Sequence, residues 1–103
     1  MENNYEIKYL PLALKDLTDI GEYISFTLCN PEAADNLLDE IDRSVNEIQN
    51  FPFSGAIYSS RKKRKLQHRM KFVKNYTIFY VVNDNIILIE RILYKRRDTK
   101  NLF

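Results

Sequence analysis

Residues 66–94 read LQHRMKFVKNYTIFYVVNDNIILIERILY, and this stretch decides the fold class because it contains three consecutive strand patterns. In its first part, polar and apolar side chains alternate with the period of two that is typical of a strand. Asn75 indicates one turn, and Asn83-Asp84-Asn85 is a strong hairpin signal. Residues 86–94 are apolar on both faces apart from Glu90 and Arg91, as in a central strand. The sequence therefore predicts an antiparallel meander of three strands.

The alternation in residues 66–73 also assigns side chains to the two faces of the first of these strands. One face carries Leu66, His68, Met70 and Phe72, and the other carries Gln67, Arg69, Lys71 and Val73. Because Met70 and Phe72 are large and apolar, we expect them to be buried beneath helices. Arg69 and Lys71 are then expected to point away from the helices, two residues apart on one exposed surface.

The N-terminal half predicts one strand and two helices. Residues 5–10 alternate like a strand, which Pro11 ends because it cannot donate to a sheet ladder. Apolar residues recur every three or four positions over residues 12–28, as in an amphipathic helix. Asn30 and Pro31 suit the cap and the first position of a second helix, which stops near Asn50.

These elements predict one α+β domain over residues 1–103, with the order β-α-α-β-β-β. An N-terminal strand is followed by an antiparallel two-helix hairpin, which packs on one face of a curved, mainly antiparallel sheet. No internal repeat or low-complexity linker suggests a second unit.

The formal net charge of +2 conceals a strong asymmetry between the two halves of the chain. Residues 1–52 contain 3 Lys and Arg against 11 Asp and Glu, whereas residues 53–103 contain 13 against 3. A basic run occupies positions Arg61, Lys62, Lys63, Arg64 and Lys65. We interpret this run as a loop that attracts nucleic acid or an acidic partner.

Cofactor and membrane chemistry receive no support from the sequence. Cys29 and His68 are the single cysteine and the single histidine, so no set of residues at metal-ligand spacing exists. We expect Cys29 to be a half-buried apolar residue and His68 a hydrogen-bonded core histidine. No apolar run is long enough to span a bilayer and no signal peptide is apparent, which predicts a cytosolic protein.

Five segments together resemble the RelE/ParE superfamily, the toxins of type II toxin–antitoxin pairs. The segments are YLPLALKDLTDIGEYI (9–24), NPEAADNLL (30–38), FPFSG (51–55), HRMKFVKNYTIFYVV (68–82) and IERILYKRRD (89–98). The resemblance lies in their order, spacing and length, and it covers nearly the whole chain. It implies a toxin that inhibits growth and is neutralised by a cognate antitoxin, alone, as a homodimer or in a toxin–antitoxin hetero-oligomer. It implies no cofactor and no metal.

The RelE-like branch of the superfamily cleaves mRNA on the ribosome without a metal, using cationic side chains on the open sheet face. Arg69, Lys71 and Arg96 match the basic residues of that branch by position, which makes them candidate catalytic residues. The chain departs from the pattern where it has Thr77 in place of an arginine. It also ends in Leu102 and Phe103, where a tyrosine is common.

The ParE-like branch, which is associated with poisoning of DNA gyrase, fits the C-terminal segment better. Its ending is similar to Arg91, Tyr94, Arg97 and Asp98 of this chain. Arg91, Tyr94 and Arg97 are therefore candidate binding residues, and Phe103 could stack on a base. We favour the ParE-like inhibitor slightly over the nuclease and keep a non-toxic antitoxin-binding module as a third hypothesis.

Structural interpretations of the same residues remain open. Arg69 and Lys71 could form a solvated sheet face, where lysine also discourages pairing with other edges. Arg91 could hold the C-terminal segment by pairing with Asp98 or with a carboxylate on a helix.

Overall fold

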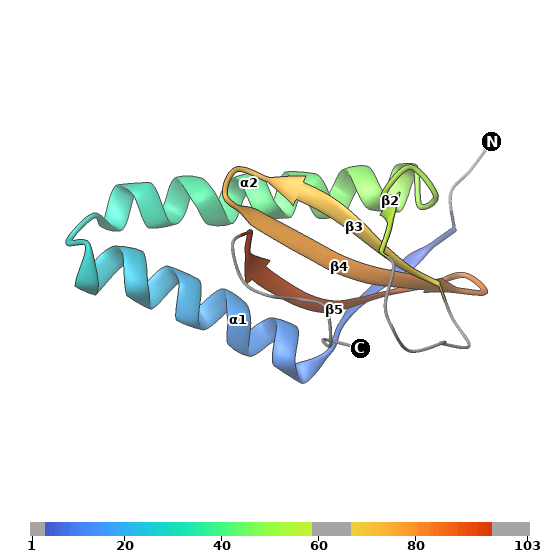
Figure 1. Cartoon of the computed structure of the whole chain (residues 1–103), viewed down its shortest axis with the longest axis horizontal. Helices are drawn as coiled ribbons and strands as arrows, with labels where there is room; N and C mark the ends of the chain where they lie inside the picture. The colour runs from blue at the N-terminus through green and yellow to red at the C-terminus, as the bar shows by residue number, and fades with distance from the viewer. Residues whose placement is uncertain (1–3, 59–66, 96–103) are drawn as a thin grey trace.

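The computed structural model describes residues 4–58 and 67–95, in which two helices pack on one face of a sheet (Figure 1). The chain starts with strand β1 (Glu6–Tyr9) and helix α1 (Pro11–Glu22), which continues into a π-helical turn, η1 (Tyr23–Thr27). Helix α2 (Pro31–Asn50) follows, and then four strands: β2 (Ala56–Ile57), β3 (His68–Val73), β4 (Tyr76–Asn83) and β5 (Ile86–Tyr94). The predicted α+β class is confirmed.

The five strands form one sheet in the order β1-β5-β4-β3-β2. β1 runs parallel to β5, and the other neighbours are antiparallel. β5 therefore has a neighbour on each side, which agrees with the central position predicted from its apolar faces. β2 was not predicted, because two residues are too few to show a period of two.

The turns and helix starts follow from local sequence. The side chain of Asn30 accepts a hydrogen bond from the Ala33 amide at 3.1 Å, which caps α2 as expected. Asp84 and Lys74 adopt positive φ angles of 54° and 55° in the two turns of the meander. Pro11 begins α1 rather than merely ending β1, because its fixed φ suits a first helical turn.

Cys29 lies in the connection between the helices, and the expectation that it is half-buried is wrong. This residue is exposed and has a positive φ of 52°, where the chain reverses between η1 and α2. A left-handed residue is a common way to end a helix, so the reversal itself places the thiol at the surface.

Apolar side chains form two clusters on opposite faces of the sheet. The main core lies between sheet and helices, and its buried members are Ala13, Ile20, Ile41, Val45, Ile48, Val73, Ile78, Tyr80, Ile87, Ile89 and Ile92. A smaller cluster on the other face consists of Tyr58, Phe79 and Leu93, with Met70 packed against it. Residues 78–80 of β4 thus contribute alternately to both clusters.

The predicted faces of β3 are reversed in the structure. Val73 is 4% exposed and belongs to the main core, whereas Phe72 is 54% exposed on the opposite face. The ammonium group of Lys71 lies 3.6 Å from the carboxylate of Glu47 on α2, so this cation points toward the helices. The alternation was ambiguous because Phe72 and Val73 are both apolar. The register with β4, which pairs Val73 with Tyr76 of the main core, decides between them.

A β-bulge interrupts the pairing of β4 with β5. Phe79 pairs with Arg91 and Tyr80 with Ile89, so Glu90 is the extra residue. The Glu90 carboxylate lies 2.6 Å from Nδ1 of His68, across the intervening strand β4. His68 is 9% exposed, which agrees with the interpretation as a paired core histidine, although it lies on the face away from the helices.

Candidate functional site

The loop after α2 is closed by two side chains from the sheet, and we call this region the loop end: residues 51–55 with Arg69 and Tyr80. The Tyr80 hydroxyl donates to the Pro52 carbonyl at 2.8 Å and accepts from the Gly55 amide at 3.2 Å. A Cβ at Gly55 would overlap this hydroxyl and lie 2.9 Å from the Met70 carbonyl oxygen. Glycine is therefore required here by space.

Arg69, the first candidate catalytic residue, completes the loop end. Its guanidinium donates to the carbonyls of Phe53 and Gly55, both at 3.0 Å, and to the Gln67 side chain at 3.3 Å. It also lies 5.2 Å from the centre of the Phe53 ring, close enough for a cation–π interaction. The Arg69 side chain is therefore held by the loop of residues 51–55 and does not project freely from an exposed face of the sheet.

Lys71, the second cation proposed for catalysis, is held by a different partner from those of Arg69. Lys71 lies on the helix side of the sheet, as described above, beside Glu47. Arg96 lies outside the described residues. Among residues 4–58 and 67–95, no group of His, Cys, Asp and Glu could hold a metal ion. In the same ranges, no helix combines the length and the apolar character that crossing a membrane requires.

Arg91 is held by a helix carboxylate, as the structural alternative predicted. Its Nε and Nη2 donate to the two Asp16 oxygens at 2.9 and 3.0 Å, and the Ile92 amide donates to the same carboxylate at 2.9 Å. Asp16 is only 9% exposed. The ion pair raises the pKa of Arg91 above its usual range, mainly through the hydrogen bonds to Asp16. Strand β1 pairs only with residues 86–89 of β5. Beyond them, the Asp16 carboxylate accepts the hydrogen bond of the Ile92 amide, which has no neighbouring strand on that side.

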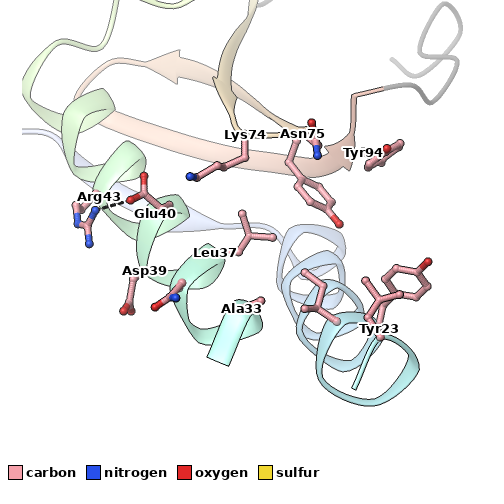
Figure 2. A pocket seen from close by; sticks show the side chains of 13 residues that line it. Tyr23, Ala33, Leu37, Asp39, Glu40, Arg43, Lys74, Asn75 and Tyr94 are labelled. Atoms are coloured by element: carbon pink, nitrogen blue, oxygen red, sulfur yellow. Dashed lines mark hydrogen bonds and ion pairs between the residues drawn. The ribbon is translucent and has the colours of Figure 1, made fainter. Parts of the chain in front are cut away.

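Tyr94, unlike Arg91, is exposed and lines a groove. Figure 2 shows this space between the tip of the helical hairpin, the β3–β4 turn and the end of β5. We call it the hairpin-tip groove; its volume is about 1080 Å³. Its lining consists of Tyr23, Ile24, Leu28, Ala33, Asn36, Leu37, Asp39, Glu40, Arg43, Lys74, Asn75, Tyr76 and Tyr94. The groove exists because the hairpin extends past the ends of the strands (Figure 1).

Tyrosines form one end of the hairpin-tip groove. The rings of Tyr76 and Tyr94 contact edge to face, with centroids 5.6 Å apart. Burial raises the pKa of Tyr76 above 10, and the neighbouring Tyr94 and Tyr23 raise it further. The Tyr76 hydroxyl therefore stays protonated at neutral pH and can donate a hydrogen bond beside an apolar surface.

Of the residues in this lining, only Tyr94 is among the binding residues predicted from the sequence. Tyr23 continues an amphipathic helix pattern, and Tyr76 is one apolar residue of a strand that is mostly core. Neither position carries a local signal that distinguishes a groove wall from a core position. The remaining predicted binding residues, Arg61, Lys62, Lys63, Arg64, Lys65, Arg97 and Phe103, lie outside the described residues.

Solved structures with the same arrangement belong to toxin–antitoxin systems. The chromosomal ParDE system from P. aeruginosa matches with a TM-score of 0.71 and 21% identity, over 90% of this chain and 98% of that chain. The archaeal RelE–RelB complex from Pyrococcus horikoshii OT3 matches with a TM-score of 0.62 and 16% identity, over 92% and 99%. The fold is that of the RelE/ParE toxins. No match was found among curated protein sequences.

Residues 7–99 match the model of the family described as ParE toxin of type II toxin-antitoxin system, parDE. The match covers well over half of the chain. The chain therefore belongs to the ParE toxin family, and the resemblance to the RelE/ParE superfamily is confirmed, with the ParE-like branch as its closer relation.

Proposed function

We propose that this protein is the growth-inhibiting toxin of a type II toxin–antitoxin module and that it acts on DNA gyrase. The observation that carries this choice of target is the fixed position of Arg69. A nuclease of the RelE-like kind needs cations aimed at the scissile phosphate. Here the Arg69 guanidinium donates hydrogen bonds to two loop carbonyls and to the Gln67 side chain.

The reversed faces of β3 add to this argument. Lys71 lies beside Glu47 of α2. The residues that alternate with Arg69 and Lys71 along β3, and therefore lie on the other face of the sheet, are Met70 and Phe72. An apolar pair at that place gives no electrostatic stabilisation to a transition state with developing negative charge. The family match and the departures at Thr77 and Phe103 point in the same direction.

Induction of the toxin gene alone tests this proposal. We expect growth to stop, DNA synthesis to fall before protein synthesis in pulse-labelled cells, and an SOS reporter to be induced. The purified protein should trap gyrase–DNA cleavage complexes and leave a purified translation system active. Arrest of translation first, with cleaved mRNA on ribosomes, would support the RelE-like nuclease instead. Normal growth with a folded protein would support a non-toxic binding module.

The basic run at positions 61–65 and the C-terminal Arg97 and Phe103 are our proposed target-contacting residues, together with Tyr94. Clustered cations increase the rate at which a protein meets a nucleic-acid-bound target. Replacing the five basic residues by glutamine should weaken gyrase inhibition, and more strongly at low salt, where the attraction of the cations is screened least. Unchanged inhibition at all salt concentrations would remove this run from the proposal.

A cognate antitoxin is the partner that we propose for neutralisation, because the structural neighbours are toxins solved within such systems. We expect a small acidic protein to be encoded beside this chain. Co-expression with that protein should restore growth, and the two proteins should copurify. Light scattering of the complex would then distinguish a heterodimer from a larger assembly. Gyrase and ribosomes both work in the cytoplasm, so we expect the toxin to act there.

A further inference from the structure

Strand β1 is the last strand on its side of the sheet, because no strand of the described residues lies beyond it. In its parallel pairing with β5, the amides of Glu6 and Leu10 donate to carbonyls of β5. The backbone groups of alternate residues point to opposite sides of a strand, so those of Tyr5, Ile7 and Tyr9 point away from the sheet. We call these outward groups the β1 edge. Such an edge is a template for pairing with another strand.

A hollow of about 620 Å³ lies along the β1 edge, between this strand and helix α2. From α2, the side-chain amide of Gln49 donates to the Tyr5 carbonyl at 2.8 Å, which agrees with the outward direction of this set of backbone groups. A carbonyl oxygen has two lone pairs, so the Tyr5 carbonyl can accept a second hydrogen bond. The hollow leaves space for the side chains of a further strand on the helix side of the sheet.

The side chains of β1 are arranged symmetrically about Ile7. Residues 5–9 read YEIKY, with a tyrosine two positions away on either side and opposite charges at the adjacent positions. Ile7 and the two tyrosines pack against the main core on the helix side, whereas Glu6 and Lys8 are exposed on the other face. Neither Glu6 nor Lys8 takes part in an ion pair within the described part of the chain. Both charges are therefore available to a partner.

This symmetry fits an antiparallel second copy of the same strand. When Ile7 lies opposite Ile7 of the second copy, the two residues exchange both of their backbone hydrogen bonds. Glu6 then lies opposite Lys8 of the second copy, in a non-hydrogen-bonded pair, where facing side chains come closest. The two-fold axis repeats this pair on the other side of Ile7, and it places each Tyr5 opposite a Tyr9. The β1 edge is therefore complementary to itself in charge and in shape.

The charges of β1 disfavour the neighbouring registers. Moving the two-fold axis by one residue sets Glu6 opposite Glu6 in one direction, and Lys8 opposite Lys8 in the other. Parallel pairing in register brings the same like charges together. Like charges directly opposite each other destabilise a sheet. A lysine on an edge strand also discourages pairing with unrelated strands, so Lys8 admits a strand that carries an acidic residue at the matching position.

We propose that two copies of this protein associate through their β1 edges, antiparallel about Ile7, so that one sheet runs through both copies. The two-fold axis is perpendicular to the sheet, which keeps the helices of both copies on the same face. Glu6 and Lys8 form two reciprocal ion pairs on the other face. Because only five residues of each copy pair, the interface is small, and we expect a dissociation constant of about 100 µM at low salt. Neither the proposed target nor an antitoxin enters this inference.

Charge reversals in β1 test the proposed register. Glu6→Lys sets two lysines opposite each other on both sides of the axis, and Lys8→Glu sets two carboxylates there. In sedimentation equilibrium at low salt, each single variant should dimerise about tenfold more weakly than the unmodified protein. An equimolar mixture of the two single variants should associate about as tightly as the unmodified protein, because every facing pair again has opposite charges. The double variant Glu6→Lys, Lys8→Glu should dimerise normally for the same reason.

Two control variants separate pairing at the β1 edge from effects of overall charge. Glu22→Lys and Lys74→Glu make the same charge changes at exposed positions outside β1, and each should alter the dissociation constant by less than about twofold. A protein that stays monomeric up to about 1 mM would overturn the inference. So would single variants that dimerise normally, or a mixture of them that fails to associate. Circular dichroism of each variant establishes that it is folded.

Hydrogen exchange of backbone amides tests the pairing of the strands themselves. The Ile7 amide belongs to the β1 edge, so it should exchange more slowly as the protein concentration rises through the dissociation constant. The Lys8 amide points toward β5 and serves as the internal control, because its exchange should change much less. Association without protection of the Ile7 amide would place the interface elsewhere and overturn the inference. A monomeric protein whose Ile7 amide is protected only in a complex with the antitoxin would assign the β1 edge to the antitoxin instead.

Discussion

The loop end and the hairpin-tip groove use the same kinds of residue, basic side chains beside aromatic rings, with opposite results. At the loop end, the side chains of Arg69 and Tyr80 form hydrogen bonds with the backbone of residues 52–55. In the groove, Lys74 and Tyr94 are exposed and have no such backbone partner within the described residues. A cation next to an aromatic residue is therefore evidence of binding only where its hydrogen-bond donors are not already satisfied.

Gly55→Ala should produce the largest loss of stability at the loop end. The added methyl group would collide with the Tyr80 hydroxyl and with the Met70 carbonyl, and overpacking of this kind costs about 2–3 kcal/mol. Urea denaturation measures the change in the free energy of unfolding. Gly21→Ala is the matched control, because its Cβ would lie at an ordinary 3.5 Å from Leu38 and alanine favours the helix. Similar losses for both variants would contradict the role of Gly55.

Tyr80→Phe should cost about 1–2 kcal/mol at neutral pH, because it leaves the Pro52 carbonyl and the Gly55 amide without their partner. Tyr94→Phe, which changes an exposed residue, should cost much less. The measurement is again denaturation by urea at constant temperature. An unchanged free energy of unfolding in Tyr80→Phe would mean that water replaces the hydrogen bonds of the hydroxyl without loss of stability.

The same pair of variants should differ in alkaline solution. Burial raises the pKa of Tyr80 above its ordinary value of 10, although the Gly55 hydrogen bond and Arg69 lower it in part. The folded state therefore favours the neutral phenol, and its stabilising effect is complete below about pH 10 and lost as the pH rises through the raised pKa. Stability should fall less steeply above pH 10 in Tyr80→Phe than in Tyr94→Phe. Parallel curves would contradict this assignment.

Arg69→Ala should lower stability by about 1 kcal/mol, because two loop carbonyls and Gln67 lose a shared donor. Toxicity should persist at a temperature where the variant is folded. Arg43→Ala removes a similar side chain from an exposed helical pair and should cost only a few tenths of a kcal/mol. If the unmodified toxin arrests translation, and Arg69→Ala is fully stable but no longer does so, Arg69 would instead be a residue of a nuclease site.

Leu28→Ser should have the smallest effect on stability, within about 0.5 kcal/mol, because this leucine is already 55% exposed. Thermal unfolding compared with Leu12→Ser provides the measurement. A large loss for Leu28→Ser alone would show that the groove is part of the core and not a surface kept open for a partner.

Local sequence signals predicted most of the fold, and the exceptions have identifiable causes. The cap at Asn30, the turn at Asn83–Asn85 and the central place of β5 were predicted because each depends on a few neighbouring residues. The faces of β3 were predicted wrongly, since two adjacent apolar residues fit either face and only pairing with β4 selects one. The bulge at Glu90 was not predicted, because it depends on the partner strand.

The sequence by itself determined the order of helices and strands apart from β2, the charge difference between the two halves and the family. The order and the charge difference follow from periodicity and composition along the chain, and the family follows from the resemblance of five segments. Only the tertiary structure decided that Arg69 and Arg91 are tied to carbonyls and to Asp16, and that Asp39 and Lys74 share one groove. The physical reason is that hydrogen bonds and ion pairs join residues far apart in sequence, such as Asp16 and Arg91, which no local pattern connects.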